Sequence, residues 1–186
     1  MLKFLVGVLI SVLIAGVAGL AFRYSGSYPM GADVPHNSLT HWALETLRES
    51  SLDRASRAVV LPDLSSPDLV LAGGADYNEM CASCHLKPGK TKTDMRLGLY
   101  PQPPNLTLPP FLHAVDVNSE RASQLARKQF WVIKHGIKAS GMPAWGKTHD
   151  DQRIWSMVAF LKQLPRLDPG QYQILTARGD TGEAHH

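Results

Sequence analysis

Two cysteines stand two residues apart in this chain, and a histidine follows the second one directly. The segment reads Cys81-Ala82-Ser83-Cys84-His85 and holds both cysteines of the 186-residue sequence. This spacing is the covalent attachment signature of c-type haem, in which two thioether bonds fix the peptide across one haem edge and the adjacent imidazole lies under the iron. Because the ligands of such iron and their surroundings set its reduction potential, the motif predicts an electron carrier with one haem c per chain.

Two other kinds of site use a Cys-x-x-Cys pair. A structural zinc site needs two further thiolate or imidazole ligands at metal spacing, and the sequence has no second cysteine pair. A thioredoxin-like pair normally opens a helix after a strand, whereas an amphipathic segment that we expect to be helical precedes Cys81. No structural disulfide competes for the two thiols. Haem attachment is therefore the preferred interpretation.

An uncharged, apolar stretch covers residues 4–22, between Lys3 and Arg23. A helix of this length spans about 28 Å, close to the hydrocarbon thickness of a bilayer. We therefore expect a transmembrane anchor in residues 1–23. A cleaved signal sequence is the alternative, because small-x-small triplets occur in the stretch, although the apolar region of a signal sequence is usually shorter.

Both interpretations of the N-terminus place the rest of the chain outside the cytoplasm. Haem c is attached in the periplasm of bacteria, so we expect an inner-membrane protein whose haem domain faces the periplasm. Nucleic acid is out of reach there and is excluded as a partner. Lys87, Lys90 and Lys92 follow His85 closely and could steer an acidic redox partner.

Three parts follow the predicted anchor. Residues 24–65 form a linker that is first rich in Gly, Ser and Pro and then contains an amphipathic helix beginning at Asn37-Ser38. We expect this helix to lie against the membrane surface or the haem domain. Residues 66–166 form the haem domain, and residues 167–186 form a C-terminal tail. The apolar residues of the linker helix have helical spacing: Leu39, Trp42, Ala43 and Leu47.

Capping signals predict three helices in the haem domain. Ser66-Pro67-Asp68 begins a helix that should run into the haem motif. Asn118 caps the next helix, and Thr148 with Asp151 resembles the capping box of the last one. Pro165 ends that helix.

The last two helices each have an apolar face. The first of these faces consists of Ala122, Ala126, Phe130, Ile133 and Ile137. The second consists of Ile154, Met157, Val158, Leu161 and Leu164. No alternating strand pattern of useful length occurs, so the predicted fold class is all-α.

A low-spin electron carrier needs a second axial ligand on the haem face opposite His85. Met142 lies in the loop between the last two predicted helices, where Gly141 lets the backbone approach the ring and Pro143 stiffens the loop. Trp145 could stack beside a haem propionate. We predict Met142 as the distal ligand. The rival ligands are Met95, His113, His135 and His149.

Residues from about 66 to 165 resemble a single-haem, mitochondrial-type (class I) cytochrome c domain, of the short bacterial variety found as membrane-tethered electron carriers. Gly73 and Tyr77 resemble the glycine and the aromatic of the family's N-terminal helix, and residues 157–162 resemble its C-terminal helix. Pro104-Asn105-Leu106 resembles the family's proline-containing loop. The resemblance implies the class I cytochrome c fold, with three to four helices around one covalently bound haem. It also implies that the Pro104 carbonyl accepts a hydrogen bond from His85 Nδ1 and that Leu106 packs on the ring.

The expected function is one-electron transfer with His85 and Met142 as axial ligands of the iron. A quinol-oxidising complex or a periplasmic dehydrogenase would be the electron donor, and a terminal oxidase the acceptor. No acid–base or nucleophilic constellation stands out, so the chain is not expected to be an enzyme. One alternative is a fixed cytochrome c subunit of a larger membrane oxidoreductase, with residues 24–65 as the docking segment. The other is a haem sensor or peroxidase, which requires an open iron site.

Overall fold

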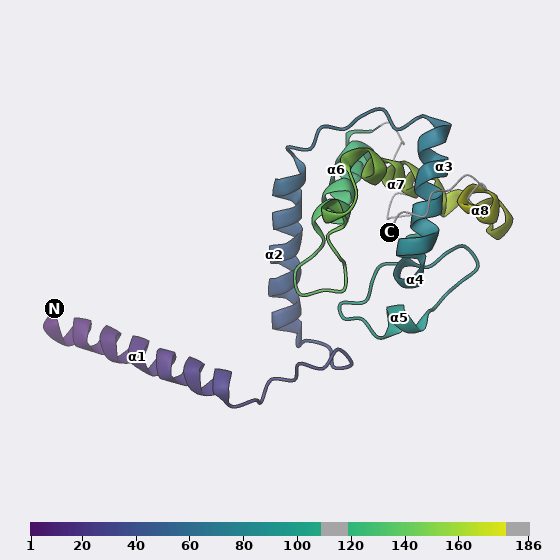
Figure 1. The fold of residues 1–186 in the computed structure, drawn as a ribbon. Coiled ribbons are helices and arrows are strands. Elements are labelled where there is room, and N and C mark those ends of the chain that lie inside the picture. The colour runs from purple at the N-terminus through teal and green to yellow at the C-terminus, as the bar shows by residue number, and fades with distance from the viewer. Residues whose placement is uncertain (109–118, 178–186) are drawn as a thin grey trace. The chain divides into compact units, whose positions relative to one another are not determined.

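The computed structural model describes residues 1–108 and 119–177 of the chain (Figure 1). These residues form helices and connecting loops, with no strand among them, which confirms the predicted all-α fold class. They divide into two compact units, residues 1–34 and the part of the chain from Pro35 onward.

The first unit contains one long helix, α1, Leu2–Tyr24. None of its side chains is buried, and its length and apolar composition are sufficient to cross a membrane. Arg23 lies in its last turn, and the Ser25 hydroxyl donates to the Phe22 carbonyl at 2.8 Å just beyond the helix end. This helix is consistent with the predicted membrane anchor.

The second unit contains the remaining helices. In chain order they are α2 Ser38–Ser56, α3 Pro67–Asp76, the π-helical turn η1 Tyr77–Cys81, α4 Ala82–His85, α5 Asp94–Leu97, α6 Glu120–His135, the 3₁₀ turn η2 Trp145–Lys147, α7 Asp151–Gln163, the 3₁₀ turn η3 Leu164–Arg166, and α8 Pro169–Thr176.

Side-chain caps explain where several of these helices begin. Asn37 is the N-cap of α2 and accepts a backbone N–H through its side chain, as its sequence position predicts. Ser66 occupies the N-cap position of α3, and Pro67 is the first helical residue. The predicted cap Asn118 lies outside the described residues. The structure assigns the cap of α6 to Ser119, whose hydroxyl accepts from a backbone N–H one turn on at 3.3 Å.

The predicted capping box of α7 is wrong. The Thr148 hydroxyl donates instead to the Trp145 carbonyl at 3.3 Å, within the preceding turn. Asp150 caps α7, and its carboxylate accepts from the Arg153 backbone N–H at 2.8 Å. Asp150 rather than Thr148 caps the helix because Asp150 directly precedes the first helical residue, so its side chain reaches the third N–H of the helix.

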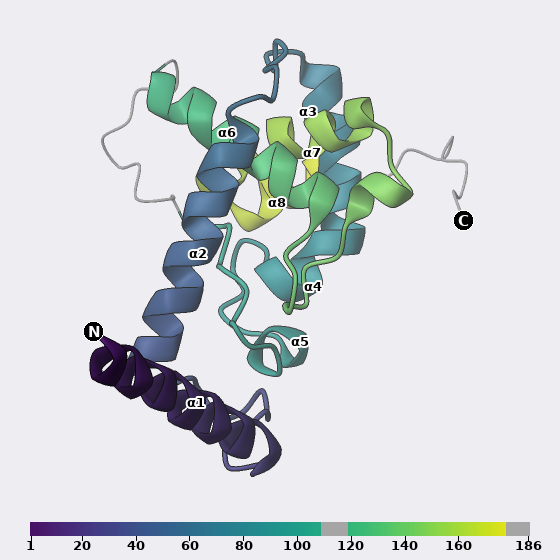
Figure 2. The same cartoon turned by 90° about the vertical axis from the view of Figure 1, so that its left-hand side faces the viewer.

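The core forms where α3 crosses α7, with α8 beside α3 (Figures 1 and 2). A Cβ on Gly73 would lie 1.9 Å from the Ser156 carbonyl oxygen of α7, so only glycine permits this crossing. A Cβ on Gly74 would lie 2.4 Å from the Leu175 carbonyl oxygen of α8. The predicted apolar face of α7 is buried throughout: Ile154, Met157, Val158, Leu161 and Leu164.

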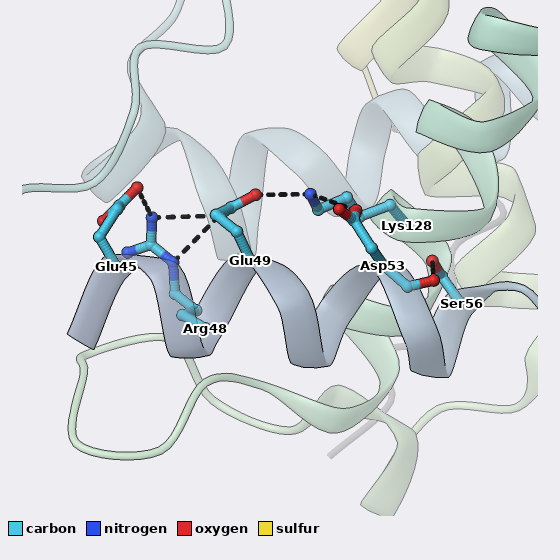
Figure 3. A network of polar contacts seen from close by, with 6 residues as sticks. All are labelled: Glu45, Arg48, Glu49, Asp53, Ser56 and Lys128. Atoms are coloured by element: carbon cyan, nitrogen blue, oxygen red, sulfur yellow. Dashed lines mark hydrogen bonds and ion pairs between the residues drawn. The ribbon is translucent and has the colours of Figure 1, made fainter. Parts of the chain in front are cut away.

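Helix α2 packs against α6 through a largely polar face. Lys128 of α6 binds Glu49 Oε2 at 2.6 Å and Asp53 Oδ1 at 2.9 Å (Figure 3), and Leu52 is buried in the same helix. The helix therefore lies against the haem domain, one of the two predicted locations, but its predicted apolar stripe is exposed and does not make the contact. Charged side chains of α2 find partners at this interface, and the apolar residues of the predicted stripe are left outside: Leu39 is 72%, Trp42 64% and Leu47 68% exposed.

The segment predicted as a tail begins with a packed helix, α8. Asp168 and Gln171 form a reciprocal capping box at its start. Tyr172 is 3% exposed and lies edge-on to Phe160 and Tyr77 in the core. The chain beyond η3 therefore contributes to the core of the second unit.

Candidate haem site

The Cys-x-x-Cys-His motif lies at the end of a continuous helical run made of α3, η1 and α4 (Figure 1). The π-helical turn η1 ends at the first cysteine, Cys81, and π-turns of this kind are frequent at functional sites. Both cysteines are partly buried free thiols. Burial raises the pKa of the Cys81 thiol to about 12, and the charges of Asp76 and Cys84 add to this effect. Before haem is attached, the Cys81 side chain is therefore a buried, neutral thiol.

The imidazole of His85 is oriented by the loop that the sequence resemblance identified. His85 Nδ1 lies 2.9 Å from the Pro104 carbonyl oxygen, so Nδ1 carries the proton and Nε2 keeps its lone pair. Leu106 N–H donates to the His85 carbonyl at 3.2 Å. Burial lowers the pKa of His85, against the effect of the hydrogen bond to Pro104, and the charge of Arg96 lowers it further. The neutral imidazole, which is the form that binds metals, is favoured.

The backbone directly after His85 adopts an unusual conformation. Leu86 has φ of 70° and is fully buried, although it is not glycine. Tyr77, which is 1% exposed, donates its hydroxyl hydrogen bond to the Leu86 carbonyl at 2.7 Å, and the His85 carbonyl lies 3.3 Å from the same hydroxyl. Burial strongly raises the pKa of Tyr77, with smaller effects from Cys81 and Tyr172. Its hydroxyl therefore stays protonated as a donor.

Met142 lies in a loop whose backbone is held at both of its polar groups. Its N–H donates to the Ser140 hydroxyl at 3.1 Å, and its carbonyl accepts from the Ile137 N–H at 3.2 Å. Gly136, with φ of 64°, brings the chain so close that a Cβ there would lie 2.7 Å from the Met142 carbonyl oxygen. A Cβ on Gly141 would lie 2.6 Å from the Leu99 side chain. These hydrogen bonds and close approaches constrain the backbone of the loop around Met142.

Four of the predicted site residues share one environment at the edge of the core. Cys81, Leu106, Met142 and Trp145 are all partly buried and pack against the same hydrophobic cluster. The loop between α6 and α7, which carries Met142, extends to the same end of the domain as α4 and α5 (Figures 1 and 2). Residues far apart in the sequence are therefore brought to one end of the fold.

The rival ligands have other surroundings. Met95 is 56% exposed in α5, and His135 is exposed at the end of α6 beside the Trp131 ring. His149 Nδ1 lies 2.8 Å from the Thr148 hydroxyl, and its ring lies edge-on to Trp145. His113 lies outside the described residues. Among these candidates, Met142 is the thioether that packs against the core.

Comparison with known families gives one match. Residues 68–161, just over half of the chain, match the family described as "Cytochrome C oxidase, cbb3-type, subunit III". The chain is a class I c-type cytochrome. The cytochrome accordingly binds haem c covalently and belongs to an electron-transfer family, as the sequence resemblance predicted. Neither the curated proteins nor the solved structures yielded a match.

The donor groups of the cytochrome fit this cofactor. Two free cysteines at the required spacing precede the His85 imidazole. Its Nδ1 is already hydrogen-bonded to the Pro104 carbonyl, so Nε2 is the nitrogen available to iron. No cluster of three or more His, Cys, Asp or Glu side chains that could hold another metal occurs in residues 1–108 and 119–177.

Sequence reasoning missed several residues that support the site. Thr93 caps α5, a helix that is not among the three predicted ones, and its hydroxyl also donates to the Ser83 carbonyl of the haem motif. Arg96 Nε donates to the Pro103 carbonyl at 3.0 Å, directly before the proline that orients His85. Thr93-Asp94 is a helix-start signal that could have revealed α5. The contact of Arg96 with a carbonyl has no such local signal.

Proposed function

We propose that the cytochrome carries single electrons, with haem c attached through Cys81 and Cys84 and held between His85 and Met142. The observation that carries this proposal is the hydrogen bond from His85 Nδ1 to the Pro104 carbonyl, because it prepares Nε2 as a ligand. The cofactor supplies an iron centre that accepts and releases one electron. The protein supplies the ligands, their orientation and the surroundings that set the potential.

Each residue has a separate part in this proposal. The bond to Pro104 fixes the rotation of the His85 ring and makes the imidazole a stronger electron donor. The Met142 thioether is a soft, neutral ligand that favours the reduced state and raises the potential. If His85 and Met142 both held the iron, no position would remain on it for a substrate. This arrangement supports electron transfer over catalysis.

Replacing the distal ligand tests the proposal. In Met142→Ala, the low-spin six-coordinate absorption spectrum should change to a high-spin or altered one, and the reduced protein should gain carbon monoxide binding. Met95→Ala is the matched control, since that methionine is exposed and its removal should leave the spectrum unchanged. An unaltered spectrum in Met142→Ala would contradict the proposed ligation. Ready carbon monoxide binding by the wild-type protein would favour a sensor or peroxidase.

We further propose that α1 holds the cytochrome in the inner membrane with the haem domain in the periplasm. The length and apolar composition of α1 support this location, as does the periplasmic chemistry of haem attachment. A quinol-oxidising complex or a periplasmic dehydrogenase would then reduce the haem, and a terminal oxidase would oxidise it. Anchoring would raise the local concentration of the cytochrome near such partners.

One observation favours a second candidate, a fixed subunit of a membrane oxidoreductase. The apolar stripe of α2 is exposed, with Trp42 at 64%, and the matched family is described by the name of an oxidase subunit. In this case the stripe would contact the partner subunit. After extraction in a mild detergent, a fixed subunit co-purifies with its partner and Trp42→Ala weakens the association. Recovery of the wild-type protein as a lone monomer would favour the free carrier.

A further inference from the structure

The peptide that follows His85 needs external support. Leu86 combines φ of 70° with complete burial, a backbone conformation that L-residues rarely adopt. Such a conformation persists only where surrounding contacts hold it. Because the peptide directly follows the predicted proximal ligand, any relaxation there would move the backbone that carries the imidazole.

Three hydrogen-bond donors provide this support. Leu86 N–H donates to the Ala82 carbonyl at 3.0 Å, and Leu106 N–H donates to the His85 carbonyl at 3.2 Å. The third comes from a side chain: the Tyr77 hydroxyl lies 2.7 Å from the Leu86 carbonyl and 3.3 Å from that of His85. The hydroxyl thus reaches the carbonyl of Leu86 itself and the carbonyl of the preceding residue, His85. No other side chain in the described residues donates to either carbonyl.

Packing alone does not explain this hydroxyl. The Tyr77 ring contacts Phe160 and Tyr172, with ring centroids 5.3 and 6.3 Å away, and a phenylalanine ring would keep both contacts. A hydroxyl buried in that cluster without an acceptor would be destabilising. Its acceptors are the carbonyl of His85, the last residue of the haem motif, and that of Leu86, so the polar group of Tyr77 is directed at the backbone of His85 and Leu86.

We infer that Tyr77 is a positioning residue, whose hydroxyl fixes the His85–Leu86 backbone and thereby the alignment of the imidazole with the Pro104 carbonyl. The inference rests on the proposed role of His85 as axial ligand. Without the hydroxyl, the backbone relaxes and the bond from Nδ1 to Pro104 weakens. The imidazole then donates less electron density, the oxidised state is less stabilised, and the reduction potential rises.

Two isosteric substitutions test the inference in the full-length protein with its haem attached. Tyr77→Phe removes the hydroxyl that reaches His85 and Leu86. Tyr172→Phe is the matched control, because its hydroxyl lies in the same aromatic cluster but donates to Asn78 Oδ1 at 3.1 Å. Both should lose stability. Only Tyr77→Phe should raise the reduction potential and speed hydrogen exchange of the Leu106 amide, which shares the His85 carbonyl.

The outcomes separate the inference from the function on which it rests. An unchanged potential and unchanged Leu106 exchange in Tyr77→Phe would overturn the positioning role while leaving the proposed ligation intact. A wild-type spectrum that survives replacement of His85 would overturn the proposed ligation itself. If Tyr77→Phe fails to mature while Tyr172→Phe matures, the difference lies in the hydroxyl contact and supports the inference. In the wild-type protein, a Tyr77 hydroxyl proton that exchanges as freely as one in solvent would overturn it.

Discussion

Arg153 and Asp76 join the two helices that cross next to the haem motif. Arg153 Nε and Nη2 donate to the two carboxylate oxygens of Asp76, each at 2.7 Å, and Asp76 directly precedes the π-helical turn that ends in Cys81. The side chain of Asp76 is 8% exposed and that of Arg153 30%. This ion pair therefore holds α7 at the start of the segment that positions the thiols.

We predict that Arg153→Met lowers the free energy of unfolding by about 2 kcal/mol, because it leaves a buried carboxylate without its main partner. The loss is smaller than for a fully buried pair, since solvent reaches Arg153. Arg127→Met is the control: it breaks a pair with Glu120, which is 71% exposed, and should cost less than about 1 kcal/mol. Denaturant unfolding of both variants measures the difference. Equal losses of unfolding free energy in the two variants would show that the buried pair stabilises the protein no more than the exposed pair does.

At the scale of elements, consecutive glycines in α3 determine how closely two helices approach. The Gly73 position faces the α7 backbone, and the Gly74 position faces the α8 backbone. The sequence resemblance identified Gly73 and the helix that it contacts as matching elements of the family. It did not predict the contact of Gly74, because α8 lies in the segment that sequence analysis assigned to a tail.

Alanine at each glycine should therefore have a different effect. Gly73→Ala should destabilise the whole domain by about 3 kcal/mol, since the backbones of α3 and α7 must separate. Gly74→Ala should mainly displace α8, which exposes Tyr172 and speeds amide exchange in residues 169–176. Gly98→Ala, where the nearest atom is 3.5 Å away, should change stability by less than about 0.5 kcal/mol. Domain-wide loss of exchange protection in Gly74→Ala, equal to that in Gly73→Ala, would contradict this division.

The contact between α2 and α6 should depend on pH. Burial of Glu49 tends to raise the pKa of its carboxyl, but hydrogen bonds and charge from Lys128 and Arg48 outweigh this and lower it below 4.5. A lowered carboxyl pKa stabilises the folded state at higher pH, and that stabilisation disappears as the pH falls through the folded value. Lys128→Met should therefore reduce stability at about pH 6 and much less at about pH 3.

Unfolding of the wild-type protein and Lys128→Met at the two pH values measures this effect, with the exposed Lys138→Met as control. A stability difference that is the same at both pH values would contradict the role of Glu49 (Figure 3).

These elements show which features could be predicted from sequence. The start of α3 and the buried face of α7 depend on local spacing, and the structure agrees with both. The prediction of haem attachment rests on the same kind of local spacing, and the family match supports it. The orientation of α2 could not be predicted in this way, because its polar face is matched by Lys128, which is distant in sequence. The contacts of Arg96 and the hydroxyl of Tyr77 with backbone carbonyls likewise depend on tertiary approach.

At the scale of the whole molecule, the chain combines an N-terminal apolar helix with a c-type cytochrome domain. The loop between α6 and α7 extends to the same end of the domain as α4 (Figure 2), and Cys81, Leu106 and Met142 pack against the same hydrophobic cluster. The proposed function requires a covalent link between haem and the cysteine pair. Without this link, the orientation of His85 and the position of Met142 would not support their proposed roles as ligands of the haem iron.

Mass spectrometry of the unfolded and digested protein, isolated from membranes after maturation, tests this claim most directly. We predict a single haem, bound through both thiols of the peptide that contains Cys81 and Cys84, and loss of the two-thioether species in Cys84→Ser. A peptide of unmodified mass in the mature protein would contradict the account.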